Sequence, residues 1–216
     1  MTHPKAQSAD IALLLEGTFP YVSGGVSSWI NQIIRAYPEY RFAIVFLGSR
    51  REDYGEFRYP LPDNVVHFEE HYLYAPIHWH QQPAPRKGSE RGEALALRLI
   101  DAFSEGMDSP RAMDAFREAA LGLQPGGALR LEDFLYSQSA WNIICDIYRK
   151  HCADPSFVDF FWTVRIMYQP LWMLARVAHE LIPVRAVHCA STGYAGFLGA
   201  LMAQTRGTPL ILSEHG

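Results

Sequence analysis

A buried strand that runs through a glycine-containing loop into a helix is the feature that most constrains how this chain folds. Ile11 to Leu15 form a continuous apolar run, typical of a parallel strand covered on both faces, and Glu16-Gly17 ends it. Apolar residues then recur at helical spacing, which predicts a helix that begins at about Val26 or Ser27, just after Gly24-Gly25. The segment therefore predicts a βα junction.

A junction of this kind favours phosphate binding. Gly24 and Gly25 lack a Cβ, so a ligand can approach the backbone, and the first-turn amides of the helix are unpaired donors at its positive end. A diphosphate would be stabilised there. The alternative is that the two glycines only make a tight turn that packs helix on strand, and the sequence leaves both interpretations open. Because TFPYVS separates Gly17 from Gly24, the dinucleotide fingerprint is missing, which disfavours a Rossmann oxidoreductase with a nicotinamide or flavin cofactor.

Composition excludes several classes of protein. The chain has 216 residues, 49% hydrophobic and 19% charged, as expected of a soluble globular protein. Its formal charge of −4 is spread over the chain, so nucleic acid is not an expected partner. The N-terminus lacks a signal-peptide pattern, which predicts a cytoplasmic protein. Cys145, Cys152 and Cys189 lack the spacing of a zinc site or disulfide framework and are predicted to be core residues.

Four more segments read as strands, and together they predict a doubly wound parallel sheet. They are Arg41 to Leu47, Val65 to Phe68, Ala186 to Cys189 and Pro209 to Leu212, with a short helix from Gly193 to Gln204 between the last two. Alternation of strands and helices is typical of a Rossmann-like α/β fold. The sequence thus predicts one Rossmann-like domain built from residues 1–70 and 183–216.

The segment between these parts, residues 71–182, is predicted to be a large helical insertion. Helices are expected near Glu93 to Ser104, Arg111 to Leu121 and Glu132 to Arg149, and from Phe157 to Ile182 with a bend at Pro170. The last segment is apolar, but Asp159, Arg165 and Arg176 argue against a membrane span. Its helical apolar stripe favours a core helix over a peripheral membrane or partner face.

Candidate site residues follow from the carboxyl ends of the predicted strands, where open α/β sheets bind ligands. Ser191 and Thr192 precede a helix, so capping and ligand contact are both open roles. Glu214-His215-Gly216 follows a buried strand where packing does not need polar residues, which favours a functional role for His215 over a turn role.

The segment His67-Phe68-Glu69-Glu70-His71, with His78 and His80 beyond it, invites comparison with a metal site. Its spacing differs from known metal motifs, so we expect loop or sheet-end hydrogen bonding and no metal. The sequence has no nucleophile-elbow and no P-loop motif, which disfavours a hydrolase or a kinase.

Three stretches together resemble the PelF-like family of bacterial exopolysaccharide glycosyltransferases, in the retaining GT-B superfamily. They are EGTFPYVSGGVSSWINQII from Glu16, HFEEHYLY from His67, and VHCASTGYAGFLGALMAQTRGTPLILSEHG from Val187. The first string is specific, and the His-x-x-Ser strand end and the Pro-x-Ile-x-Ser-Glu-His-Gly end are shared more widely among retaining GT-B enzymes. The resemblance implies that the sheet is half of a GT-B fold.

The same resemblance implies transfer of a hexose from a UDP-sugar to a growing exopolysaccharide, such as the Pel polysaccharide of biofilms, with no metal or other cofactor. By similarity, His215 is the catalytic residue that orients the donor sugar, and Glu16, Tyr21 and Ser191 lie on the acceptor side of the cleft. The remaining substrate-binding residues are expected to be Gly24, Gly25, Val26, Thr192 and Glu214. Membrane-bound polysaccharide synthase proteins are possible partners, with the enzyme peripheral at the inner membrane.

Enzymes of this superfamily carry a second, C-terminal Rossmann-like domain that binds the donor, and this chain stops at Gly216 without one. We therefore expect the chain to be the N-terminal domain of a hexosyltransferase and to be inactive alone. A different class stays open: a non-catalytic docking module of a polysaccharide synthase complex, which would leave a contiguous apolar patch of the Phe157 segment in solvent.

Overall fold

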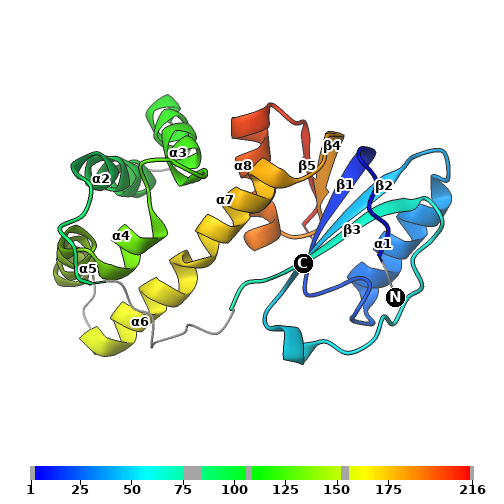
Figure 1. Ribbon diagram of the computed structural model, residues 1–216, viewed down its shortest axis with the longest axis horizontal. Coiled ribbons are helices and arrows are strands. Elements are labelled where there is room, and N and C mark those ends of the chain that lie inside the picture. Colours follow the sequence, from blue (N-terminus) through cyan, green and yellow to red (C-terminus); the bar gives the residue numbers. More distant parts are fainter. Residues whose placement is uncertain (1–2, 75–83, 106–108, 152–155, 215–216) are drawn as a thin grey trace. The chain divides into compact units, whose positions relative to one another are not determined.

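The computed structural model describes residues 3–74, 84–105, 109–151 and 156–214, and the chain divides into two compact units. We call Met1–Ala75 together with Glu180–Gly216 the sheet unit, and Pro76–His179 the helical unit. Every strand of the described residues belongs to the sheet unit (Figure 1).

The sheet unit is built on five parallel strands: β1 (Ala9–Glu16), β2 (Phe42–Gly48), β3 (Val65–Tyr72), β4 (Val184–Cys189) and β5 (Leu210–Leu212). Their order in the sheet is β3-β2-β1-β4-β5. The chain builds outward from β1 to β3 and then returns to the other side of β1, so the order reverses between β1 and β4. This confirms the predicted Rossmann-like, doubly wound α/β fold.

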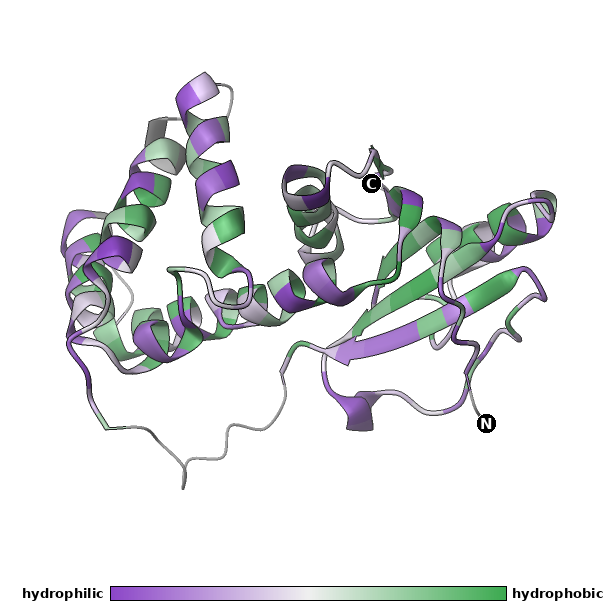
Figure 2. Cartoon of the chain, turned by 45° about the horizontal axis from the view of Figure 1, so that its top comes forward, coloured by the Kyte–Doolittle hydropathy of each residue, from purple (hydrophilic) through white to green (hydrophobic). Residues whose placement is uncertain are grey.

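Strand β1 is covered on both faces, which explains its uninterrupted apolar run. Leu13 and Leu15 join a buried cluster with Ile30 and Ile34 of α1 (Gly25–Ala36). The side chain of Leu14 points the other way, toward Gly199 of α8 (Tyr194–Arg206). Each fully buried leucine or isoleucine contributes about 1.5 to 3 kcal/mol to folding. In Figure 2 the central strands are accordingly green along their length.

Strand β3 lies at the edge of the sheet and is more polar than the rest, turning from green to purple along its length in Figure 2. Its open side is partly covered by the N-terminal segment of the chain. The amide of Phe68 donates to the carbonyl of Pro4 at 3.0 Å, and the amide of Ala6 donates to the carbonyl of Val66 at 3.0 Å. These bonds pair backbone groups that an edge strand otherwise leaves exposed.

The helical unit contains α2 (Glu90–Glu105), α3 (Pro110–Leu123), α4 (Leu131–Tyr136), α5 (Gln138–His151), α6 (Phe157–Tyr168) and α7 (Pro170–Glu180). The prediction of one helix from Glu132 to Arg149 is wrong, because the chain breaks at Ser137. Ser137 has extended backbone angles, and its hydroxyl accepts a hydrogen bond from the amide of Ala140 at 3.1 Å. It therefore starts a second helix.

The interruption expected at Pro170 is confirmed: α6 ends at Tyr168 and α7 begins at Pro170, which lacks the N–H that would continue the first helix. The expectation of a core helix is wrong for α6, none of whose residues is fully buried, and Met167 and Tyr168 are exposed. Of the predicted core cysteines, Cys189 is buried, Cys145 is half-buried and Cys152 lies outside the described residues. Among the described helices, none has the length and hydropathy required to cross a bilayer.

Close packing of α8 on the sheet gives the first testable prediction. A Cβ at Gly199 would lie 2.5 Å from the Cys189 sulfur and 2.7 Å from Leu210 Cδ1, too close for either atom. We expect Gly199→Ala to lower the free energy of unfolding by about 1 to 3 kcal/mol, despite the better helix propensity of alanine. Urea denaturation followed by circular dichroism measures the change.

Gly25→Ala is the matched control, because Gly25 is also helical and a Cβ there meets nothing within 4 Å. It should be neutral or stabilising. Equal stability of the two variants would contradict the packing of α8 described above.

Candidate functional site

The sheet unit has a cavity of about 190 Å³ at the carboxyl ends of β1 and β4, where the strand order reverses. Ligands of open α/β sheets bind at this position. Its lining residues come from the last position of β1, from the segments that follow β1, β4 and β5, and from the first turn of α1: Glu16, Thr18, Val26, Ala190, Ser191, Thr192 and Glu214. The structure thus brings together five of the predicted site residues, Glu16, Val26, Ser191, Thr192 and Glu214.

Two hydroxyl groups at this cavity have unused hydrogen-bonding capacity. Thr18 Oγ1 and Ser191 Oγ are buried, and neither has a hydrogen-bond partner within the described part of the chain. A buried polar group left unpaired costs about 1 to 3 kcal/mol, so both hydroxyls favour a polar occupant. Thr18 was not singled out in the sequence, although it follows the first strand by two positions and the strand-end rule covers it.

Glu16 occupies the N-terminus of α8. Its Oε2 accepts a hydrogen bond from the amide of Ala195 at 3.2 Å, which places a negative charge at the positive end of the helix. A Cβ on Gly193 would lie 2.6 Å from the same oxygen, so glycine is required where this carboxylate approaches the backbone. Ser191 does not cap α8. The N-cap is Gly193, which has no side chain to bind the first-turn amides.

The N-terminus of α1 is different, because it is left open. Its N-cap is Gly24, which supplies no side-chain hydrogen bond, and the first turn holds no acidic residue. Both Gly24 and Gly25 are exposed, and a Cβ at either would meet nothing within 4 Å. Gly24 has an extended φ of 169°, which any residue adopts. Neither packing nor backbone conformation therefore accounts for this pair of glycines.

Tyr21 lies apart from the cavity, although the sequence grouped it with Glu16 and Ser191. Its ring packs against Phe46 at a centroid distance of 4.7 Å, and its hydroxyl donates to the carboxylate of Glu70. Arg51 Nη1 contacts both partners, at 3.3 Å from the tyrosine oxygen and 2.7 Å from Glu70 Oε1. Burial, followed by the hydrogen bond to Glu70, raises the pKa of Tyr21. Tyr21 thus belongs to a hydrogen-bonded cluster beside β3.

His215, predicted as the catalytic residue, lies outside the described residues, as do His78 and His80 of the histidine-rich segment. Its neighbour Glu214 is described and exposed at the cavity. The role predicted for His215, orienting the donor sugar, therefore stays a prediction from the sequence.

The histidines of β3 are joined through Glu69. Its two carboxylate oxygens lie 2.7 Å from His67 Nε2 and 3.0 Å from His71 Nε2, and His67 Nδ1 lies 3.1 Å from the carbonyl oxygen of Ala6. Hydrogen bonds from His71 first and His67 second lower the pKa of Glu69 to about 2, against the effect of burial. Within the described residues, no three histidine, cysteine or acidic side chains gather as metal ligands.

A parallel sheet covered by helices on both faces, with a cavity at the reversal of strand order, defines a Rossmann-like α/β domain. The chain belongs to the family described as Domain of unknown function (DUF3492), whose model matches residues 9–216. This domain occurs in glycosyltransferase-like proteins. A search of curated proteins and a search of solved structures each gave no significant match.

The Glu69 cluster gives a prediction about pH. Because the pKa of Glu69 in the folded protein is about 2, below its ordinary value of 4.5, its ionised form stabilises the fold. This contribution is complete above pH 4.5 and is lost as the pH falls from 4.5 toward 2. We expect Glu69→Gln to lower the free energy of unfolding by about 2 kcal/mol at pH 7, and by progressively less below pH 4.5.

Denaturant titrations at several pH values from 7 to 2.5 measure the difference between the variant and the native protein. Glu56→Gln serves as control, because Glu56 is exposed and should show no such dependence. A difference for Glu69→Gln that stays constant with pH would rule out this ionic contribution.

Proposed function

We propose that this chain is the N-terminal, acceptor-side domain of a retaining GT-B hexosyltransferase similar to PelF. The enzyme would transfer a hexose from a UDP-sugar to a growing exopolysaccharide, the Pel polysaccharide of biofilms being the model. The observation that carries this proposal is the cavity at the strand reversal, which combines unpaired hydroxyls with an uncapped helix start. Occurrence of the family in glycosyltransferase-like proteins supports the same reaction class.

The N-terminus of α1 suits the diphosphate of the donor. Val26, in the first turn of α1, lines the cavity, so the helix start lies at its edge. Unpaired first-turn amides and a partial positive charge of about half a unit stabilise an anion at such a position. Negative charge grows on the UDP as the glycosidic bond of the donor breaks, so the same donors would stabilise the transition state. This use of the helix dipole needs no metal or other cofactor.

The cavity itself suits a sugar ring. An apolar cavity of about 150 Å³ in another protein holds benzene, so about 190 Å³ accommodates one six-membered ring. Thr18 Oγ1 and Ser191 Oγ would hydrogen-bond sugar hydroxyls, with Thr192 at the exposed rim. The carboxylates of Glu16 and Glu214 would accept hydrogen bonds from other hydroxyls. We assign His215, directly after Glu214, to orienting the donor sugar at the reacting carbon.

A second candidate function rests on the helical unit. On α6 the side chains of Val158, Trp162 and Ile166 follow one another at intervals of four residues, and they are 61%, 39% and 53% exposed. Residues four apart lie on one face of a helix, so they form an apolar stripe. Such a stripe is typical of a docking face. We propose that it binds membrane-bound polysaccharide synthase proteins and holds a cytoplasmic enzyme at the inner membrane.

The diphosphate site is tested by adding a charge where the phosphates would lie. Gly24→Asp puts a carboxylate at the N-cap of α1, which keeps or slightly raises stability because aspartate caps helices at least as well as glycine. The same charge repels a diphosphate and competes for its amide donors. We expect the dissociation constant for UDP, measured by calorimetric titration, to rise at least about 10-fold.

Gly55→Asp is the matched control, since Gly55 is also exposed and a Cβ there meets nothing within 4 Å. It adds the same charge away from the cavity and should leave UDP binding unchanged. Equal affinity of both variants, or no UDP binding by the native protein, would refute the donor site. In an assay with radiolabelled UDP-hexose the chain alone should transfer no label, and substantial turnover would contradict the assignment to one domain of a two-domain enzyme.

The docking stripe is tested separately with Val158→Glu combined with Ile166→Glu. Both side chains are exposed, so the fold should tolerate the change. We expect loss of cosedimentation with membranes from cells that make the polysaccharide, with UDP binding unaltered. Retention on those membranes would exclude α6 as the docking face.

A further inference from the structure

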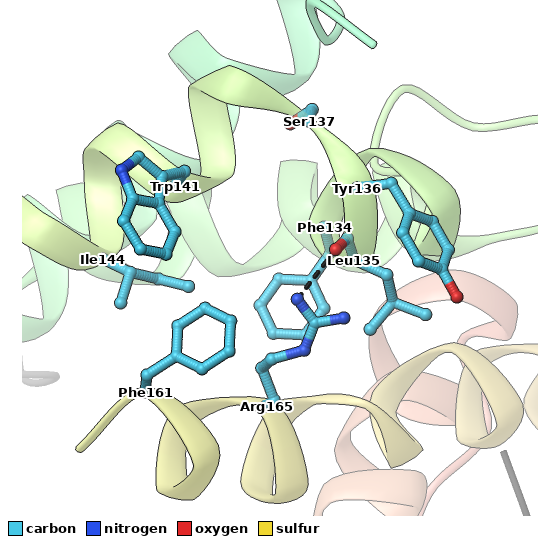
Figure 3. A pocket seen from close by; sticks show the side chains of 8 residues that line it. All are labelled: Phe134, Leu135, Tyr136, Ser137, Trp141, Ile144, Phe161 and Arg165. Carbon is cyan, nitrogen blue, oxygen red and sulfur yellow. Dashed lines mark hydrogen bonds between the residues drawn. The ribbon is translucent and has the colours of Figure 1, made fainter. Parts of the chain in front are cut away.

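The helical unit contains an open cavity of its own, of about 230 Å³, lined by α4, α5 and α6. Figure 3 shows Arg165 rising from α6 into the space below α4 and α5, with Trp141, Ile144 and Phe161 gathered on one side of it. The cavity differs in chemistry from the one in the sheet unit, because most of its walls are aromatic or aliphatic.

Arg165 enters the cavity without a negatively charged partner among the described residues. Its Nη1 donates to the carbonyl oxygen of Leu135 at 2.7 Å, and no carboxylate lies within ion-pair distance in the part of the chain that the structure describes. The guanidinium lies 5.1 Å from the ring centre of Phe161 and 6.0 Å from that of Tyr136. A guanidinium has five N–H donors, and within the described residues Leu135 supplies the one hydrogen-bond acceptor of Arg165.

Partial burial makes the positive charge of Arg165 less favourable. Arg165 is half-buried, and burial lowers the pKa of its guanidinium. Contacts with aromatic faces return only part of this cost, whereas buried charges in proteins are normally paired. A carboxylate would supply what is missing, since it binds a guanidinium through two parallel hydrogen bonds.

The walls restrict the kind of anion. Arg165 is the one cationic side chain among the eight lining residues that Figure 3 labels, so it matches a single negative charge. Phe134, Trp141 and Phe161 offer aromatic surface, which favours a planar apolar body over a strongly hydrated inorganic anion. A cavity of about 150 Å³ is known to hold benzene, so 230 Å³ leaves room for a ring and a carboxylate.

We infer that this cavity is a binding site for a small aromatic monocarboxylate, whose carboxylate pairs with Arg165 and whose ring packs against Trp141, Ile144 and Phe161. The inference does not depend on the proposed sugar transfer, because it uses other residues in the other unit. It adds a second ligand class to the protein, and the helical unit is then more than a spacer between strands.

Benzoate and its neutral isostere benzamide are the probes, titrated into the protein by calorimetry. We expect benzoate to bind at least 10-fold more tightly than benzamide. Arg165→Met should lower the benzoate affinity at least 10-fold, and Arg165→Lys should give a smaller loss because it keeps the charge but not the two-pronged geometry. Arg117→Met, which removes an exposed arginine of α3, should leave binding unchanged.

Several outcomes would overturn the inference. They are absence of benzoate binding, equal binding of benzoate and benzamide, undiminished binding by Arg165→Met, and displacement of benzoate by equimolar inorganic phosphate. Should Arg165→Met fail to fold, the benzoate and benzamide comparison on the native protein and the Arg165→Lys variant still decide. Trp141→Phe locates the site, since quenching of tryptophan fluorescence by benzoate should decrease in that variant.

Discussion

Burial of β1 on both faces is the constraint on which the rest of the sheet unit depends. Because Leu13 and Leu15 pack against α1 while Leu14 faces α8, both helices must run back along the sheet from its carboxyl edge. Their N-termini therefore meet at one edge, beside the point where the strand order reverses. The cavity is a consequence of this geometry. Its lining can be polar, since packing does not require apolar residues at those strand ends.

The two helix starts at this edge are treated in opposite ways. At α8, the carboxylate of Glu16 takes an amide hydrogen bond, and Gly193 gives it room, so the positive end is neutralised by the protein itself. At α1, the glycine pair leaves the amides without a side-chain cap and the space in front of them open. If glycine served only compactness, a Cβ at Gly24 would clash, as it does at Gly193. The asymmetry is what one expects when one end binds an external anion.

The sequence was informative wherever one periodicity dominated. All five strands and helix α8 follow from apolar runs and their punctuation. In β1 and β2 the run reflects burial on two faces, whereas Leu210, Ile211 and Leu212 of the edge strand β5 are apolar but exposed. The sequence was less informative where one side chain decides between continuation and a break: Ser137 caps a new helix inside an apparently continuous pattern. Periodicity also did not show that Met167 would be exposed, since a helical stripe specifies a face and not what covers it.

The position of the site could be predicted from the topology of the sheet, but the contacts of individual side chains could be predicted only in part. Glu16, Ser191 and Glu214 come together because strand ends of a parallel sheet share one edge. Tyr21 lies in the loop that follows Glu16, but its ring packs against Phe46. A single sequence does not reveal such a contact between distant segments. The sequence also did not show whether Glu16 faces a ligand or a helix end, because both arrangements place an acidic residue at the end of β1.

Glu16 and Glu69 differ from Arg165 in how the fold compensates their charge. Glu16 is balanced by an amide at a helix end, and Glu69 by two histidines, so each carboxylate already has its partners within the fold. Arg165 has a single carbonyl oxygen and two aromatic rings. An aliphatic residue there would avoid the desolvation cost of a half-buried guanidinium, so the position of Arg165 supports the proposed binding of an external anion.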